Sequence, residues 1–119
     1  MGCRYNLFIV DYKGVLQATT LYKSSFCDTI IGTNIKELLS REHATTYMDA
    51  LDTVLKTGKK VYVEYSLGKR LYLSIIVKID CDTAYSHEIE IQGSKARAKK
   101  ILQSWVKERN VFLKKGDLK

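Results

Sequence analysis

The segment from residue 32 to residue 58, with the change of hydrophobic period that follows it, most constrains how this chain folds. Ser40 is predicted to cap a helix over about 41–57, and Gly58 is predicted to end it. After Gly58 apolar residues recur at every second position, which predicts a strand over about 60–67 with one buried face. The apolar stripe of the helix, at helical spacing, consists of Ala44, Tyr47, Met48, Leu51, Val54 and Leu55.

The remaining elements follow from shorter patterns. The spacing of Asp11 and Gly14 between two β-rich runs predicts a hairpin with strands over 5–10 and 15–20. A short helix is expected over 35–39, while 21–31 is compatible with one or two helical turns. Strands over about 70–79 and 84–92 and a helix to about 115 complete the chain. This order predicts an α+β fold on a five-stranded antiparallel sheet, with one face wet or covered by a partner.

The charge of the chain lies at one end. Residues 1–93 hold eleven Lys or Arg and eleven Asp or Glu, whereas residues 94–119 hold nine against two, so the whole net charge of +7 falls there. We therefore divide the 119 residues into a neutral domain over 1–93 and a basic amphipathic helix and tail over 94–119.

Several classes of protein find no support in the sequence. There is no phosphate-binding loop, nucleophile motif, metal-ligand spacing or signal-peptide core, and the three cysteines stand far apart. We expect a cytoplasmic protein that is not an enzyme, holds no metal and needs no cofactor. The lack of proline and the many Lys, Ile, Tyr and Thr residues fit an AT-rich genome, such as that of a phage or a low-GC bacterium.

The order of these motifs resembles that of a PAS domain over about residues 5–92. The matching features are the Asp11 and Gly14 hairpin, the Gly32, Asn34 and Leu39 turn, and the long helix ending at Gly58. The resemblance implies a sensory or interaction module with a five-stranded sheet, short helices and one longer helix on one face, and a flanking C-terminal helix. Some members hold a ligand between helices and sheet, and many dimerise through the flanking helix.

The resemblance suggests where a small-molecule ligand would lie. A pocket between the long helix and the sheet is expected to be lined by Tyr47, Leu51, Tyr65, Leu73 and His87. The surroundings of Cys27 lack the flavin-binding pattern of the family, and His43 lies a turn early for a haem ligand. Both are better explained as structural residues.

The last helix carries two kinds of candidate contact. The helix is expected to pack on its own domain, to pair with a second copy or to bind a different partner. For the last two cases its expected anchors are Ile101, Trp105 and Phe112. A run of cations is expected to meet nucleic-acid phosphates or an acidic protein surface (Lys95, Arg97, Lys99, Lys100, Lys107, Arg109). Three functions stay open: an interaction module acting through a homodimer or a partner protein, a nucleic-acid-associated regulator, and a small-molecule sensor.

Overall fold

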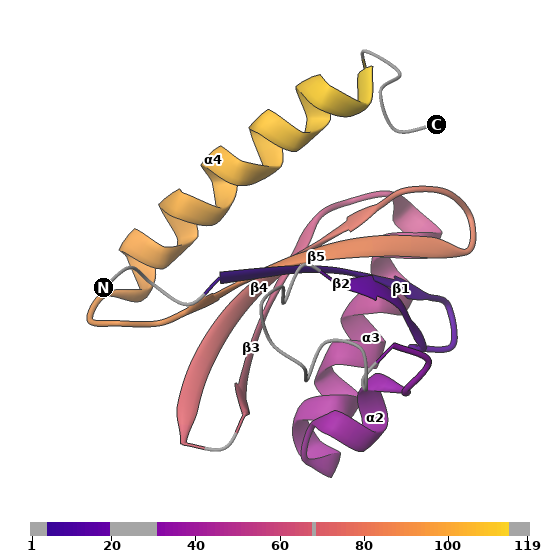
Figure 1. Cartoon of the computed structure of the whole chain (residues 1–119), viewed down its shortest axis with the longest axis horizontal. Helices are drawn as coiled ribbons and strands as arrows, with labels where there is room; N and C mark the ends of the chain where they lie inside the picture. The colour runs from indigo at the N-terminus through magenta and orange to yellow at the C-terminus, as the bar shows by residue number, and fades with distance from the viewer. Residues whose placement is uncertain (1–4, 20–30, 68, 115–119) are drawn as a thin grey trace.

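A computed structural model describes residues 5–19, 31–67 and 69–114 of the chain (Figure 1). The predicted elements are confirmed, with ends that differ by one or two residues; most of the segment 21–31 lies outside the described residues. The elements are β1 (Tyr5–Asp11), β2 (Leu16–Thr19), α2 (Ile35–Leu38), α3 (Arg41–Thr57), β3 (Val61–Leu67), β4 (Arg70–Lys78), β5 (Thr83–Glu90) and α4 (Lys95–Lys114).

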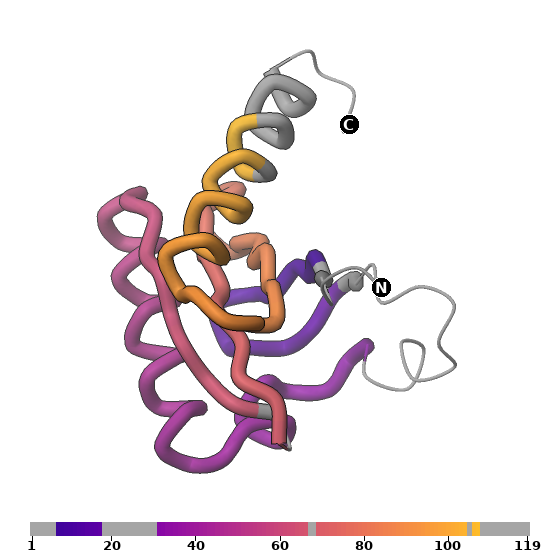
Figure 2. The backbone as a smooth tube through the Cα atoms, turned by 90° about the vertical axis from the view of Figure 1, so that its left-hand side faces the viewer, coloured from indigo at the N-terminus to yellow at the C-terminus, as the bar shows by residue number. Residues whose placement is uncertain are grey.

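The five strands form one antiparallel sheet, as predicted, and the structure places them in the order β2-β1-β5-β4-β3. Helix α3 packs on one face, which we call the inner face, and α4 packs on the opposite, outer face (Figure 1). Figure 2, turned by a quarter, shows α3 running alongside the strands while α4 continues past them. Strand β5 therefore lies at the middle of the sheet with a helical layer on each side.

Helix α3 begins and ends as its sequence predicts. The Ser40 side chain accepts a hydrogen bond from the His43 backbone N–H (3.3 Å), and Gly58 takes a left-handed conformation with φ of 76°. The buried residues of the helix are Ala44, Tyr47, Ala50, Leu51 and Val54, which lie on one stripe.

The first hairpin and the start of α2 are joined by a set of hydrogen bonds that we call the hairpin junction (residues 11–15 and 34–36). The Asn34 side chain caps α2 and also donates to the Lys13 carbonyl (2.9 Å). The Ile35 N–H donates to the Gly14 carbonyl (2.7 Å), and the Asp11 carboxylate accepts from backbone N–H groups of the turn. Two of the three motifs that suggested the resemblance, the hairpin and the turn at Asn34, thus form one structural unit.

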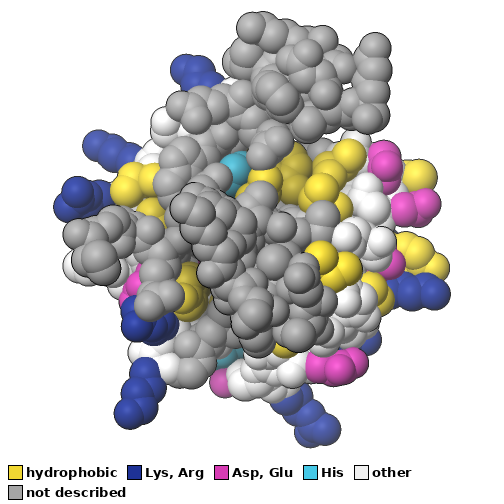
Figure 3. Space-filling model, viewed as in Figure 1, with side chains coloured by type: hydrophobic (Ala, Val, Ile, Leu, Met, Phe, Trp, Pro, Cys, Tyr) yellow, Lys and Arg dark blue, Asp and Glu magenta, His cyan; other side chains and the backbone are white. Residues whose placement is uncertain are grey.

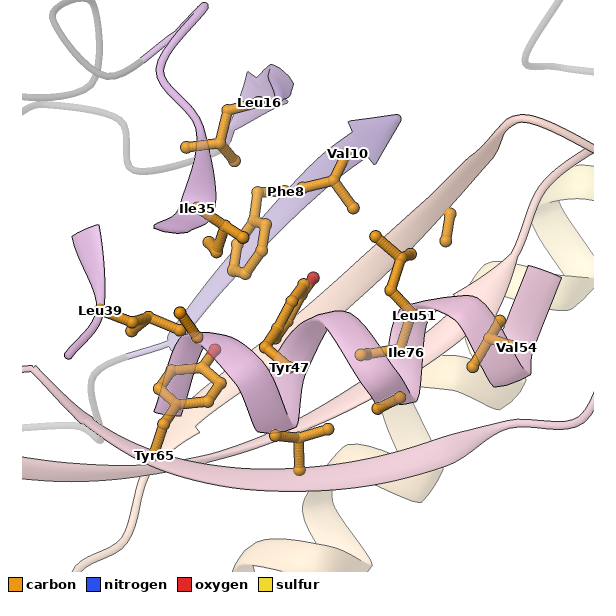
Figure 4. Packing of buried hydrophobic residues seen from close by; sticks show 14 of the residues in the cluster. Phe8, Val10, Leu16, Ile35, Leu39, Tyr47, Leu51, Val54, Tyr65 and Ile76 are labelled. Atoms are coloured by element: carbon orange, nitrogen blue, oxygen red, sulfur yellow. The ribbon is translucent and has the colours of Figure 1, made fainter. Parts of the chain in front are cut away.

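Two apolar clusters flank the sheet. The inner cluster lies between α3 and the strands and includes Phe8, Val10, Leu16, Ile35, Leu39, Tyr47, Leu51, Val54, Tyr65 and Ile76 (Figure 4). The outer cluster lies under α4 and consists of Leu73, Ile75, Ile89, Ala98, Leu102 and Val106. The face that was expected to be wet or covered by a partner is instead covered, over β4 and β5, by the chain's own helix.

We expect Gly14→Ala to lower the free energy of unfolding by more than Gly93→Ala. Both glycines have φ near +90°, where an alanine costs about 1–2 kcal/mol. A Cβ at Gly14 would also lie 2.8 Å from Met48 Sδ and 3.2 Å from Asn34 Oδ1, whereas Gly93 has open space. Urea unfolding of both variants measures the difference, and equal losses would show that the hairpin junction has room for a side chain.

Candidate functional site

A group of polar side chains is buried within the inner cluster. The Tyr47 and Ser86 hydroxyls share a hydrogen bond of 2.6 Å, and the Tyr65 hydroxyl donates to Glu88 Oε1. Ser74 and Ser86 have no exposed surface, and Glu88 is only 4% exposed. We call Tyr47, Tyr65, Ser74, Ser86 and Glu88 the polar cluster. A buried carboxyl is costly unless it is hydrogen-bonded, so this group is the chemically distinctive feature of the interior.

The strand register brings the polar cluster together. Ser86 and Glu88 are two residues apart on β5 and so share its inner face. On β4, Ser74 pairs directly with Glu88, which places their side chains on the same face. Tyr47 reaches the cluster from the buried stripe of α3, and its ring lies 6.1 Å edge-on from that of Tyr65. Three strands and one helix thus contribute to one polar centre.

Burial changes the acidity of both tyrosines. Loss of solvent raises the pKa of Tyr47 far above its ordinary value of 10.0; the bond with Ser86 opposes this rise, and the negative charge of Glu88 adds to it. Burial likewise raises the pKa of Tyr65, and the negative charge of Glu88 is the next largest cause. Both hydroxyls therefore keep their protons at neutral pH, and the Tyr65 hydroxyl is a donor to the Glu88 carboxyl.

The structure brings together three of the five predicted pocket residues. Tyr47, Leu51 and Tyr65 belong to the inner cluster. The placement of Leu73 in that pocket is wrong, because Leu73 lies in the outer cluster under α4. His87 is buried, pairs with Ile75 across β5 and β4, and meets the ring of Tyr85 edge-on at 5.3 Å. The alternation of β5 puts it on the face opposite to Ser86 and Glu88.

Sequence reasoning missed the polar members of the site. The predicted pocket placed Leu73 and His87 on the face of the long helix, and by alternation this puts Ser74, Ser86 and Glu88 on the other face. The signal that identifies their face is the hairpin between β3 and β4. Tyr65 pairs with Tyr72 across this hairpin, so the face of Tyr65 continues to Ser74 and, through β5, to Glu88.

Helix α4 lies on the outer face through a short apolar stripe. Ala98, Leu102 and Val106 are buried against β4 and β5, and Ile101 is half-buried beside them. Trp105 and Phe112 lie on α4, but their side chains fall outside the described residues.

The predicted cations of α4 divide into two groups. At the start of the helix, Lys95 pairs with Glu64 (2.6 Å) and Lys99 lies 4.7 Å from the centre of the Tyr62 ring. Arg97, Lys100 and Lys107 are exposed, while the side chain of Arg109 is outside the described residues.

Solved structures with the same arrangement are known. A domain of an HTR-like protein from Haloarcula marismortui is 17% identical, with a TM-score of 0.63 over 74% of this chain and 98% of that one. The PAS domain of the quorum-sensing receptor RpfR from Cronobacter turicensis, in complex with BDSF, is 20% identical, with a TM-score of 0.64 over 77% of this chain and 98% of that one.

The Drosophila melanogaster Cycle PAS-B domain, with bound ethylene glycol, is 12% identical, with a TM-score of 0.59 over 72% of this chain and 99% of that one. The chain has a PAS-like fold. No family model and no curated protein matches the sequence. At these identities the likeness concerns the fold alone, and it confirms the architecture that the sequence motifs predicted.

Within this PAS-like fold, the described residues offer no group of three His, Cys, Asp or Glu side chains that could hold a metal ion. His43 Nδ1 lies 3.2 Å from Ser40 Oγ and 3.4 Å from the Ser66 backbone nitrogen, so this ring joins the start of α3 to β3. Cys27 is outside the described residues, and Cys81 is exposed. None of the helices in the described part of the chain is long and apolar enough to cross a membrane.

The raised pKa values of the buried tyrosines predict a loss of stability at alkaline pH. Above pH 10 the unfolded chain ionises Tyr47 and Tyr65, whereas the folded chain keeps both protons. The free energy of unfolding should therefore fall as pH rises above 10, by up to about 1.4 kcal/mol per pH unit for each tyrosine.

Urea unfolding between pH 8 and pH 11 measures this dependence. Tyr47→Phe and Tyr65→Phe should each make it shallower, and Tyr12→Phe, which removes an exposed hydroxyl, is the control. The same slope in all four proteins would contradict the burial of these hydroxyls.

Proposed function

We propose that this chain is a non-enzymatic PAS-like regulatory module that acts through protein contacts of α4, either in a homodimer or on a partner protein. The observation that carries the proposal is that α4 is longer than the part of it that packs on the sheet. The helix has 20 residues, or roughly 30 Å, and among the α4 side chains that the structure describes the buried ones run from Ala98 to Val106, about 12 Å. Eight further residues lead to Lys114, and this part of the helix extends past the sheet (Figure 1).

The sequence of α4 supports contacts beyond its own domain. At 100° per residue, Ile101, Trp105 and Phe112 lie within about 40° of one another around the helix, beside the buried stripe of Ala98, Leu102 and Val106. Ala98 packs on the sheet, and we assign Trp105 and Phe112, with Ile101 beside them, as the anchors for the partner. Large aromatic residues supply much of the energy of such contacts. The name of the RpfR domain, a quorum-sensing receptor, is consistent with a regulatory role for this fold.

The test separates packing within the chain from contact between chains. We expect the full-length protein to dimerise in light scattering over a concentration series, and Phe112→Ala to weaken the dimer at least tenfold while the monomer keeps its stability. The matched control is Leu102→Ala, which removes a fully buried side chain of the same helix and should cost about 2–5 kcal/mol of unfolding free energy. An unchanged dimer in both Trp105→Ala and Phe112→Ala would contradict the assignment of the anchors.

The polar cluster favours a second candidate function, the sensing of a small molecule between α3 and the sheet. Apolar binding sites commonly hold a few convergent polar groups that orient the ligand, and the inner cluster contains such a set. The RpfR PAS domain was solved with C12:0 and with BDSF, so a related fold holds small molecules. We assign Tyr47, Leu51 and Tyr65 to the lining of this site and Glu88 to the orientation of the ligand.

Mass spectrometry of the extract from natively purified protein tests this candidate. We expect a small molecule that co-purifies with the chain, raises its melting temperature when added back, and does so less for Glu88→Gln. The control for charge is Gln92→Glu. It adds a negative charge at an exposed position after β5, where Glu88→Gln removes a buried one. An empty extract together with no shift from a metabolite panel would contradict the sensor function and leave the interaction function standing.

A further inference from the structure

The side of α4 that faces away from the sheet is a row of cations. At 100° per residue, Arg97, Lys100, Ser104 and Lys107 lie opposite to the buried Ala98, Leu102 and Val106, and all four are exposed. We call these four residues the outward face of α4. In the space-filling view, Lys and Arg side chains project along the edge of the molecule where α4 runs (Figure 3).

These cations are not explained by the stability of the helix. A cation in the first turn opposes the helix dipole, and the first turn of α4 contains no acidic residue. Glu64 pairs with Lys95 rather than with the outward face, and no ion pair in the described part of the chain uses Arg97, Lys100 or Lys107. The N-terminal end of the helix therefore adds its own positive potential to a row of cations that forms no ion pair in the described part of the chain.

The side chains of the outward face fit some anionic partners better than others. Protein interfaces are depleted in Lys and enriched in aromatic residues, whereas the four described residues of the outward face are three cations and a serine. Single-stranded nucleic acid is bound by stacking on aromatic rings, which the outward face lacks. Insertion into a membrane surface needs a free apolar face, and the four residues of the outward face include no apolar side chain.

A duplex recognised by its phosphates fits the remaining features. A straight helix places Lys100 and Lys107 about 10 Å apart on one line. The major groove of B-form DNA is about 12 Å wide and admits a helix, whereas that of A-form RNA is too narrow. We propose that the outward face of α4 binds double-stranded DNA through its phosphate groups, without reading the base sequence. This proposal depends on the exposed cations and not on the dimer or ligand proposed above.

Fluorescence anisotropy with a 20-base-pair duplex and the full-length chain tests the proposal. We expect binding whose logarithmic affinity falls linearly with the logarithm of salt concentration. The triple variant R97Q, K100Q, K107Q should lose about 2.7 of that slope, since each phosphate contact contributes about 0.9. At low salt it should bind at least tenfold more weakly than the natural chain. Because all three side chains are exposed, circular dichroism should show an unchanged fold.

The matched control removes the same charge from the opposite side of the molecule. Lys13, Lys36 and Lys56 are exposed and lie on the first hairpin, α2 and α3. Their triple change to Gln should leave affinity within about twofold and the salt slope unchanged. Three outcomes would each overturn the proposal. They are an equal loss of affinity in both triple variants, undetectable DNA binding at 50 mM salt, and tighter binding to duplex RNA or polyglutamate than to DNA.

Discussion

The alternation of side chains along β5 is the constraint on which the rest of the structure depends. This strand lies between β1 and β4, and its register with both is fixed over its whole length. Ser86 and Glu88 therefore face α3, while His87 and Ile89 face the other way. A shift of the β5 register by one residue would place the carboxyl of Glu88 in the apolar layer under α4. It would also remove the apolar surface on which that helix packs. The polar cluster and the position of α4 are thus two consequences of one register.

The register also links the two candidate functional layers. A change in the hydrogen bonds of Ser86 or Glu88 acts on a strand whose next residue, Ile89, belongs to the outer cluster. Protein interiors are densely packed and transmit small displacements, so a group bound among Tyr47, Tyr65 and Glu88 would alter the surface on which α4 lies. The sensor and interaction functions proposed for this chain are therefore compatible, with the inner layer as input and α4 as output.

Much of the fold could be predicted from the sequence because its signals are local. The N-cap at Ser40, the left-handed end at Gly58 and the hairpin at Asp11 and Gly14 depend on a few neighbouring residues. The pairing of Asn34 with the turn at Lys13 could not be read from the pattern, since it joins residues 21 positions apart. The candidate site was only partly predictable for a related reason. Hydrophobicity suggested that Leu73 faces the long helix, but the hairpin register assigns that face to Ser74.

Helix α4 has an apolar side and a cationic side, and this division limits which partners each side can bind. Its buried residues Ala98, Leu102 and Val106 pack on the sheet, so a partner protein is left with the anchors proposed above, and an anion with the outward face. These two uses do not compete for the same side chains. A symmetric dimer formed by the later turns would present two outward faces related by a twofold axis, which matches the symmetry of a DNA duplex. Each protomer would then contribute its own phosphate contacts, and the salt dependence of binding would be about twice that of one helix.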